Sequence, residues 1–488
     1  MTSTVDQPPA TDPPGLREQD RARRLARQEA SIDDMARWQR RHRGHYAELA
    51  RLFRLHVPAR ARVLEVGCGL GDLLAAMDPE TGVGVDLSPR LIEVARARHP
   101  HLRFEAQDPE SFDLGETFDF IILGNALADL NDIQSCLACV RRHCHPDTRL
   151  VMSSHNALWG PILRTASALG LRRRTGEQNW LALDDFDNLL RLTEFDIIRR
   201  ASETLLPLRI PVVATVLNRF VAKFWPCKHL CLTQMVIARP DVPPPGASEL
   251  SCTILIPTKD ERGNIAPALA RVPMMGSHTE IIFVDGNSAD GTEEEIRRQM
   301  ALHPHLDIRF LAQGDGIGKG DAVRKGFAAA TGDVLMILDA DLTVPPEDLP
   351  RFFEAIVAGR GEFINGTRLV YPMEKQAMRF LNKCGNKFFS MVFTWLIGQR
   401  FRDTLCGTKV LRKTHYDVIA SNRHYFGDFD PFGDFDLLFG AAKANLKIIE
   451  IPVRYRARTY GDTSISRFRH GFLLLRMSAL AFRKLKLR

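Results

Sequence analysis

Residues 332–341 read Gly-Asp-Val-Leu-Met-Ile-Leu-Asp-Ala-Asp, an apolar run that ends in two acids one residue apart. A short apolar run between turn residues is typical of a strand buried on both faces of a sheet. Acids at the carboxyl end of such a strand lie where α/β sheets bind ligands. Asp339 and Asp341 offer oxygen ligands of the kind that Mg²⁺ or Mn²⁺ prefers. The stretch therefore predicts a parallel α/β sheet with a cation site at its edge.

Short runs rich in Val, Ile and Leu, alternating with helical patterns, extend this prediction over the rest of the chain. In the second half the predicted strands are 252–257, 280–285, 308–312, 334–339 and 362–367. In the first half they are 62–66, 82–86, 118–124, 150–154, 195–199 and 234–238. The fold class that follows is α/β with two doubly wound domains, and 488 residues are enough for both.

The proline run Pro243 to Pro245 separates the two halves, because it continues neither a helix nor a central strand. We expect a disordered basic arm over residues 1 to about 30, followed by a helix, within a leading segment 1–42. A first domain over 43–238, a linker over 239–250 and a second domain over 251–488 follow.

The predicted strand 62–66 runs directly into Gly67-Cys68-Gly69-Leu70-Gly71, a loop that lets the backbone approach a ligand closely. Glu65 precedes the loop, and Asp86 ends the next strand, where it can accept the hydroxyl groups of a ribose. Asp108 follows a strand candidate near Phe104. This GxGxG spacing with its acids favours S-adenosylmethionine over a dinucleotide.

The strings VLEVGCGLGDLL, GVGVDLS, FEAQDPESF and FDFIILGNAL resemble the class I S-adenosylmethionine-dependent methyltransferases, over about residues 43–240. The resemblance implies a Rossmann-like domain that holds the cofactor at Glu65, Gly67, Gly69, Asp86, Asp108 and Asn125. His155 is a candidate for a base and Asn156 for an orienting residue toward an unknown methyl acceptor. The alternative is that both residues have a structural role, which is more common for a lone histidine at such a position. A domain of this fold that no longer binds the cofactor remains the alternative.

The run CLACVRRHCH, residues 136–145, has the residue types of a zinc site. It also fits a helix over 133–145 that places Leu137 and Val140 against the sheet. We favour cysteines with a structural role here.

In the second half, TILIPTKDE, FVDGNSADGT, GIGKGDAVRKGF and GDVLMILDADLTVPPEDL resemble family 2 glycosyltransferases of the nucleotide-diphosphosugar fold. Within that family the resemblance is to dolichyl- or polyprenyl-phosphate mannosyl- and glucosyltransferases. It implies a nucleotide-sugar site at Pro257, Lys259, Glu261, Asp285, Lys319, Ala340 and Arg368. It implies metal ligands at Asp339 and Asp341, an acidic residue near the acceptor at Asp436, and a phosphate-binding arginine at Arg458.

Two positions depart from the family pattern. Gly286 stands where a second acid usually follows Asp285, which weakens the prediction of ribose recognition. Ser464 stands where a lysine is common, so Arg456 or Arg467 would have to serve the acceptor phosphate. No QxxRW string follows the acidic positions, which favours a single addition over polymer synthesis. An acceptor phosphate, with a second pKa of about 6, is largely anionic at neutral pH and needs no strong base.

Residues 454–488 hold ten basic residues against one acid, within a chain of net charge +7. In the predicted helix 467–485, arginines recur at 469, 476 and 483 between apolar residues, which favours docking on a membrane surface over packing alone. Residues 388–397 form a second apolar stretch, too short to span a bilayer. No apolar run of spanning length and no signal peptide is visible, so we expect a cytoplasmic enzyme, peripheral on the inner face of the membrane.

The sequence as a whole predicts a bifunctional transferase. One activity is metal-dependent sugar transfer from a nucleotide-sugar to a polyprenyl phosphate or related lipid or glycan acceptor. The other is S-adenosylmethionine-dependent methylation. The alternatives are a glycosyltransferase with a non-catalytic scaffold domain, and a nucleic-acid methyltransferase that uses the basic ends. The second is weaker because few aromatic residues interleave the arginines.

Overall fold

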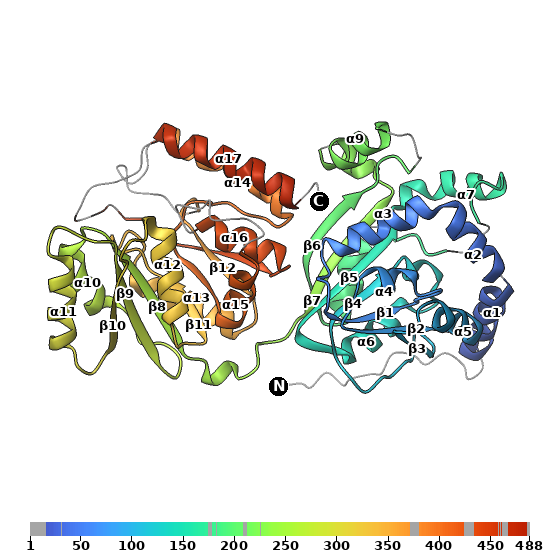
Figure 1. Cartoon of the computed structure of the whole chain (residues 1–488), viewed down its shortest axis with the longest axis horizontal. Coiled ribbons are helices and arrows are strands. Elements are labelled where there is room, and N and C mark those ends of the chain that lie inside the picture. The colour runs from blue at the N-terminus through green and yellow to red at the C-terminus, as the bar shows by residue number, and fades with distance from the viewer. Residues whose placement is uncertain are drawn as a thin grey trace, which may run out of the picture. The chain divides into compact units, whose positions relative to one another are not determined.

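The computed structural model describes residues 16–30, 32–173, 178–181, 183–207, 212–224, 226–370, 380–423, 434–456, 458, 460 and 467–485. The chain forms two compact units (Figure 1). The N-terminal unit comprises Met1–Asp196 and Ala201–Pro240, and the C-terminal unit comprises Ile197–Arg200 and Asp241–Arg488. The main division of the chain therefore falls inside residues 239–250.

The N-terminal unit is built on a seven-stranded sheet of order β3-β2-β1-β4-β5-β7-β6. Its strands are β1 Arg62–Val66, β2 Thr81–Asp86, β3 Arg103–Ala106, β4 Phe118–Gly124, β5 Cys144–His155, β6 Phe195–Glu203 and β7 Thr233–Pro240. Strands β1 to β5 run parallel. Strand β7 runs antiparallel to β5, so the sheet is mixed at this side.

Helices connect these strands, and local sequence explains where several of them begin. They are α1 Leu16–Ala30, α2 Ile32–Arg41, α3 Arg43–Arg54, α4 Asp72–Ala76, α5 Pro89–Arg98, η1 Ala126–Asp129, α6 Ile133–Arg142, η2 Ala157–Trp159, α7 Gly160–Ala168, α8 Leu183–Leu192, α9 Val213–Arg219, η3 Val221–Lys223 and η4 Cys227–Leu230. The Ser88 side chain caps α5 by accepting a hydrogen bond from Leu91 N. Asp132 caps α6 in the same way, through Ser135 N.

Helix α1 corrects the prediction of a disordered arm up to about residue 30. It runs from Leu16 to Ala30, and just beyond it Ile32 is buried in a small cluster with Leu70 and Leu91. Composition suggested disorder because the segment is rich in arginine and poor in apolar residues. The arginines have acidic partners on the unit, however, with Arg24 Nη1 2.6 Å from Glu110 Oε1.

The C-terminal unit contains a second seven-stranded sheet, of order β10-β9-β8-β11-β13-β12-β14. Its strands are β8 Cys252–Thr258, β9 Thr279–Asp285, β10 Asp307–Ala312, β11 Val334–Ile337, β12 Phe363–Thr367, β13 Lys409–Arg412 and β14 Ile448–Pro452. Strand β13 lies antiparallel between β11 and β12, and the other pairings are parallel. The sequence did not predict β13 or β14, and this sheet is also mixed.

Helices cover both faces of the second sheet. They are η5 Ala247–Glu249, α10 Arg262–Arg271, α11 Thr292–Leu302, α12 Gly318–Ala329, η6 Pro346–Asp348, α13 Leu349–Val357, α14 Phe380–Ile397, α15 Lys413–Ser421, α16 Asp434–Lys443 and α17 Arg467–Leu485. Ile254 packs with α10, α11 and α13, whereas the adjacent Leu255 packs with α12 and α14 to α17. Because successive strand residues face opposite sides, the apolar strands fill two cores.

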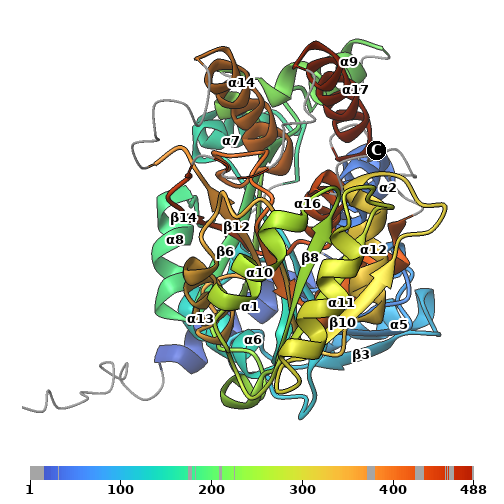
Figure 2. The same cartoon turned by 90° about the vertical axis from the view of Figure 1, so that its left-hand side faces the viewer.

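Helices α14 and α17 pack against each other on one face of this unit (Figures 1 and 2). Leu474 and Met477 of α17 are buried in the core, while Phe472 and Leu475 are exposed. The helix thus has one packed side and exposes apolar side chains on the other. No helix among the described residues has the length and hydropathy needed to span a membrane.

Candidate functional sites

The loops after β8 and β9 are tied together at the carboxyl edge of the second sheet. Ser288 donates to Asp285 from its backbone N to Oδ2 at 2.9 Å and from its Oγ to Oδ1 at 2.5 Å. Lys259 Nζ donates to the carbonyl oxygens of Gly286 and Asn287 at 2.7 and 2.6 Å. Lys259 and Asp285, both assigned to the nucleotide from the resemblance, therefore lie at one edge and fix the shape of the two loops.

Asp339 follows β11 after one residue, Leu338, and is paired with Lys319 in the first turn of α12. Lys319 Nζ lies 2.7 Å from Asp339 Oδ1. Burial raises the pKa of the Asp339 carboxyl, but the charges of Lys319, Lys409 and Arg368 outweigh burial and hold that pKa below its ordinary value. The carboxylate is therefore ionised and surrounded by cations.

Gly407 closes one side of the Asp339 carboxylate, a contact that the sequence reading did not identify. A Cβ at position 407 would lie 2.0 Å from Asp339 Oδ2 and 2.6 Å from Cγ. Only a glycine leaves that space open, so residue 407 belongs to the site although it lies 68 positions further along the chain.

Asp341 and Glu261 share one arginine from the basic C-terminal segment. Arg458 Nη2 lies 2.7 Å from Asp341 Oδ2, and its Nη1 lies 3.5 Å from Glu261 Oε1. The second Asp341 oxygen, Oδ1, accepts from the backbone N and the Oγ1 of Thr343 at 3.1 and 2.8 Å. Burial raises the pKa of Glu261, against the opposing effects of Asn264 and Arg458. Arg458 thus links β8 and β11 at the edge where Asp339 lies.

Arg368, assigned to the sugar phosphates from the resemblance, is held by a buried acid that the sequence reading missed. Its Nε and Nη2 lie 2.7 and 2.8 Å from the two oxygens of Asp403, and its guanidinium lies 5.0 Å from the ring centre of Tyr455. Burial raises the pKa of Asp403, but Arg368 and a hydrogen bond from Asn386 lower it to about 2. This pairing fixes the position of the Arg368 guanidinium, whose positive charge helps to lower the pKa of Asp339.

Asp436, in α16, has a different neighbour from the other predicted site residues. Arg423 Nε, just after α15, donates to Asp436 Oδ2 at 2.9 Å. The side chain is buried. Asp436 therefore holds the Arg423 guanidinium.

The donor set at Asp339 and Asp341 fits a hard divalent cation. Two carboxylates one residue apart supply oxygen ligands, and the glycine at position 407 lets the Asp339 carboxylate lie close against the backbone. Mg²⁺ and Mn²⁺ commonly use one or two protein carboxylates and fill their other positions with substrate phosphate and water. Ala340 is buried between the two acids, and Ser464, raised above as a departure, lies outside the described residues.

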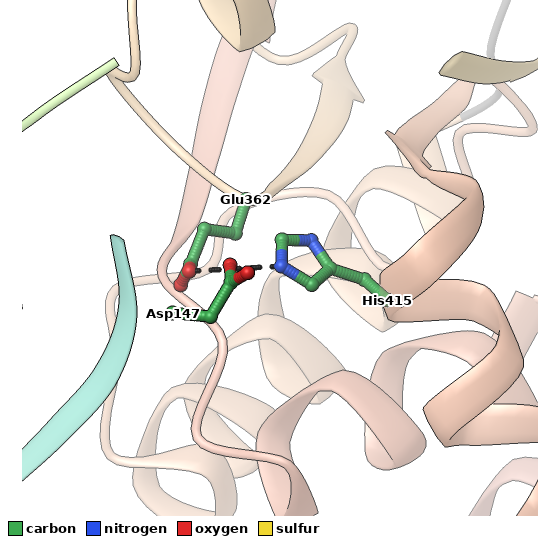
Figure 3. A group of neighbouring side chains, drawn as sticks. All are labelled: Asp147, Glu362 and His415. Atoms are coloured by element: carbon green, nitrogen blue, oxygen red, sulfur yellow. Dashed lines mark ion pairs between the residues drawn. The ribbon is translucent and has the colours of Figure 1, made fainter. Parts of the chain in front are cut away.

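A buried histidine and glutamate in this unit lie close together, away from that edge. His415 Nε2 lies 3.8 Å from Glu362 Oε1, and both side chains are buried (Figure 3). Glu362 directly precedes β12, which runs in the same direction as β11, so it lies at the amino edge of the sheet, opposite Asp339. Asp147, also drawn there, belongs to the N-terminal unit.

The glycine loop of the N-terminal unit adopts the backbone that its glycines allow. Gly67 and Gly69 have φ of +74° and +52°, the left-handed region that favours glycine. Gly67 N donates to Val85 O at 2.8 Å, and Gly69 N donates to Asp86 Oδ2 at 2.8 Å. The loop is therefore fixed against the end of β2.

The two acids beside this loop are almost wholly buried. Glu65 Oε2 accepts from Leu74 N at 2.9 Å, and Asp86 Oδ1 accepts from Ser88 N at 3.2 Å. Burial raises the pKa of Glu65 well above its ordinary value, and it also raises the pKa of Asp86, against hydrogen bonds from Gly69 and Ser88. Both residues are preorganised as hydrogen-bond acceptors at the carboxyl edge of the sheet.

Asp108 is engaged by arginines of α1, which the sequence did not predict. Arg24 Nη2 and Arg21 Nε each lie 3.4 Å from Asp108 Oδ2. Asn125, predicted on the same edge, has φ of +62° and exchanges hydrogen bonds with Ser153 Oγ at 3.1 Å through its backbone N and its Oδ1. Helix α1 therefore contacts Asp108, one of the positions assigned to the cofactor from the resemblance.

His155, at the end of β5, lies beside a second histidine. The rings of His155 and His45 stack with centroids 6.4 Å apart. Burial, with Arg172 and His45, lowers the pKa of His155 to about 3, so the imidazole is neutral at physiological pH. Asn156 is occupied elsewhere, because its Nδ2 donates to the carbonyl oxygens of His229 and Cys231.

The cysteine and histidine run follows a structural pattern. Cys136 and Cys139 are buried on α6. Both ring nitrogens of His143 have backbone partners, Cys139 O at 2.8 Å and Leu114 N at 2.9 Å. Helix α6 ends at Arg142, and β5 begins at Cys144, so the predicted helix over 133–145 is too long.

Comparisons with known proteins identify a domain in each unit. The family model "Glycosyl transferase family 2" matches residues 253–427, and the model "Methyltransferase domain" matches residues 37–200. These two models confirm both sequence resemblances.

Curated relatives match the second half of the chain. A dolichol-phosphate mannosyltransferase of Pyrococcus furiosus is 28% identical over 221 residues, 44% of this chain and 59% of that protein. An undecaprenyl-phosphate 4-deoxy-4-formamido-L-arabinose transferase of Edwardsiella ictaluri is 28% identical over 217 residues, 43% of this chain and 62% of that protein. The match thus spans about three fifths of the length of either relative.

Solved structures match the first half. A SAM-dependent methyltransferase of Thermotoga maritima is 16% identical, covers 44% of this chain and 99% of its own, and has a TM-score of 0.35. Because that score is below 0.5, the fold of the N-terminal unit rests on its own sheet and on the family model.

Proposed function

We propose that this chain, which carries a methyltransferase domain and a family 2 glycosyltransferase domain, transfers a sugar from a nucleotide-sugar to a polyprenyl phosphate and methylates a second acceptor. The observation that carries the first activity is the paired arrangement of Asp339 with Lys319 and of Asp341 with Arg458 at one sheet edge. Two acids and two cations at this edge suit a cation and a diphosphate together.

Asp339 and Asp341 would hold Mg²⁺ or Mn²⁺, which when bound supplies positive charge to the diphosphate of the donor. Lys319 and Arg458 stand beside these acids and would bind the remaining phosphate oxygens. Lys259 and Asp285 shape the loops around the nucleotide, with Pro257 next to them. Glycosyl transfer then depends mainly on positioning and on charge stabilisation.

A polyprenyl phosphate is the acceptor that agrees with the chemistry and with the names of the relatives, which are a dolichol-phosphate and an undecaprenyl-phosphate transferase. Its phosphate oxygen is already anionic at neutral pH and attacks without a strong base. Asp436 is then a positioning residue, because it holds Arg423. Exposed Phe472 and Leu475, with Arg476, would place α17 on the cytoplasmic face of the membrane.

The N-terminal unit would bind S-adenosylmethionine at the edge formed by β1, β2 and β4. Gly67 and Gly69 give the backbone room for the ligand, and the buried acids Glu65 and Asp86 accept hydrogen bonds from it. Asp108 and Asn125 complete the predicted set. The rival function is that of a scaffold domain with the same fold and no cofactor.

Thermal shift measurements on the full chain test these assignments separately. A nucleotide-sugar that binds together with Mn²⁺ is expected to raise the melting temperature of the C-terminal unit. S-adenosylmethionine is expected to raise the melting temperature of the N-terminal unit. The Asp341→Ala variant is expected to lose the first response and to keep the second, and the Asp86→Ala variant the reverse. Absence of any response to S-adenosylmethionine, confirmed by calorimetry, would favour the scaffold, and strong salt-sensitive RNA binding would favour a nucleic-acid methyltransferase.

A further inference from the structure

The exposed apolar side chains of the N-terminal unit are gathered on two segments. Of the twelve large apolar side chains described there as exposed, ten lie on residues 158–171 and 212–230. Their exposed fractions run from 41% at Phe220 to 74% at Val212. We name these ten side chains, which lie on or directly beside η2, α7, α9, η3 and η4, the α7–α9 surface. A contiguous group of exposed apolar side chains usually marks an interaction site, whereas single exposed apolar residues need no explanation.

The two segments form one surface. Trp159 Nε1, at the start of the first segment, donates to Leu230 O at 2.8 Å, at the end of the second. Asn156 Nδ2 donates to His229 O at 2.9 Å and Cys231 O at 3.1 Å. Helices α7 and α9 lie at the same end of the N-terminal unit (Figure 1). The surface begins next to His155, at the carboxyl end of β5, the edge where the glycine loop lies.

The charge of the surface indicates what it contacts. Residues 155–173 and 205–240 contain no acidic residue. Arg164, Arg219 and Lys228 are exposed among the apolar side chains. Apolar side chains interspersed with cations, and free of acids, suit the boundary between anionic headgroups and acyl chains. A surface that binds a protein partner can contain acidic residues, so their absence from these two segments is not expected for that case. Charge complementarity therefore favours an anionic lipid surface.

We propose that the α7–α9 surface docks on an anionic lipid membrane. The N-terminal unit then has its own membrane contact, distinct from α17 in the other unit. If the proposed methyltransferase activity holds, on which this last step rests, its acceptor is a lipid-anchored compound that reaches the sheet edge from the membrane.

Co-sedimentation of the full chain with lipid vesicles tests the proposed docking. One set of vesicles contains phosphatidylcholine alone, and the other also contains about 30% phosphatidylglycerol to supply anionic headgroups. The variants Val213→Asp/Val216→Asp and Ile162→Asp/Leu169→Asp place acids on each segment. Leu192→Asp, at the exposed last residue of α8 in the same unit, is the matched control. We expect both double variants to bind the anionic vesicles more weakly than the wild type, with α17 supplying the binding that remains, and the control to bind as the wild type does. Replacing Arg219 and Lys228 by Gln is expected to weaken that binding about fivefold for each charge.

The contribution of α17 is separated with Phe472→Asp/Leu475→Asp, which changes only exposed positions of that helix. In this background the remaining vesicle binding should still depend on the α7–α9 surface. Unchanged binding in both N-terminal double variants would overturn the proposal, provided that their melting curves match the wild type. A shift to a smaller oligomer in light scattering, without loss of vesicle binding, would instead make the surface a contact between copies of the chain. Loss of cofactor binding leaves the vesicle result unaffected, so the two proposals fail separately.

Discussion

Arg458 places Nη2 2.7 Å from Oδ2 of Asp341, a residue 117 positions earlier in the chain. This ion pair connects the basic C-terminal segment to the acidic strand end at which nucleotide, metal and phosphate are expected to meet. The C-terminal charge excess therefore has two parts, since Arg458 lies in the site whereas Arg476 and Arg483 are exposed on α17.

The first prediction concerns Arg458 itself. The Arg458→Gln variant removes the cation shared by Asp341 and Glu261 and should lower kcat/KM for sugar transfer about 100-fold, or about 2.7 kcal/mol. Arg454→Gln is the matched control, because Arg454 is exposed four residues earlier and has no role assigned to it in the site. Steady-state kinetics with purified protein measure both, and equal rates for the two variants would show that Arg458 has no role in transfer.

The second prediction concerns the space beside Asp339. In Gly407→Ala the new Cβ would meet the carboxylate, with 2.0 Å to Oδ2, so either Asp339 or the loop must move. We expect transfer to fall at least about tenfold, with a higher Mn²⁺ concentration needed for half-maximal rate. Gly385→Ala on α14, where a Cβ meets nothing within 4 Å, should leave the rate unchanged. A Gly407→Ala enzyme with normal metal dependence would contradict the assignment of Asp339 to the metal.

The third prediction is a stability effect at Asp403. Asp403→Asn breaks the buried pair with Arg368 and should destabilise the C-terminal unit by about 3–5 kcal/mol. Because the pKa of Asp403 is lowered to about 2 in the folded chain, its contribution is present above the unfolded pKa of about 3.9 and is lost as the pH falls toward 2. Denaturant unfolding between pH 3 and 7 measures this, with exposed Asp417→Asn as control.

The fourth prediction concerns Glu65, whose pKa burial raises well above the ordinary value. The folded chain then holds a proton that the unfolded chain releases, so the stability of the N-terminal unit falls as the pH rises above about 4.3 toward the folded pKa. Glu65→Gln removes this loss and should melt higher than wild type at pH 8 but not at pH 4, while binding S-adenosylmethionine more weakly. Exposed Glu93→Gln should do neither. Melting curves parallel to wild type at both pH values would contradict the effect of burial.

Strand positions were predictable wherever a run of Val, Ile and Leu had two turn boundaries. Strand β1, Arg62–Val66, was predicted to the residue, and β11 was found two residues shorter than expected. Strand β13 escaped because it has only four residues and begins at Lys409, a fully buried lysine that composition assigns to the surface. The antiparallel direction of β7 also escaped, because direction depends on pairing across the sheet and leaves no mark in a single strand.

The motifs of the candidate sites could be found in the sequence, but the contacts between their residues could not be predicted. Asp339 and Asp341 stand out in the sequence because they end an apolar strand. Their partners Lys319 and Arg458, and the closeness of Gly407, depend on how distant loops meet. The role of Asp403 could not be predicted from the residues around it, because an acidic residue in a polar loop is common. Its importance depends on the buried Arg368 side chain that the fold places against it.

Sugar transfer by the full chain tests the central claim most directly. Labelled nucleotide-sugars, one at a time, are incubated with undecaprenyl phosphate and Mn²⁺, and the label in the organic phase is measured with and without a chelator. We predict metal-dependent transfer from at least one nucleotide-sugar, lost in Asp341→Ala at unchanged melting temperature. Undiminished transfer by the Asp341→Ala variant, or no transfer from any nucleotide-sugar, would contradict the account.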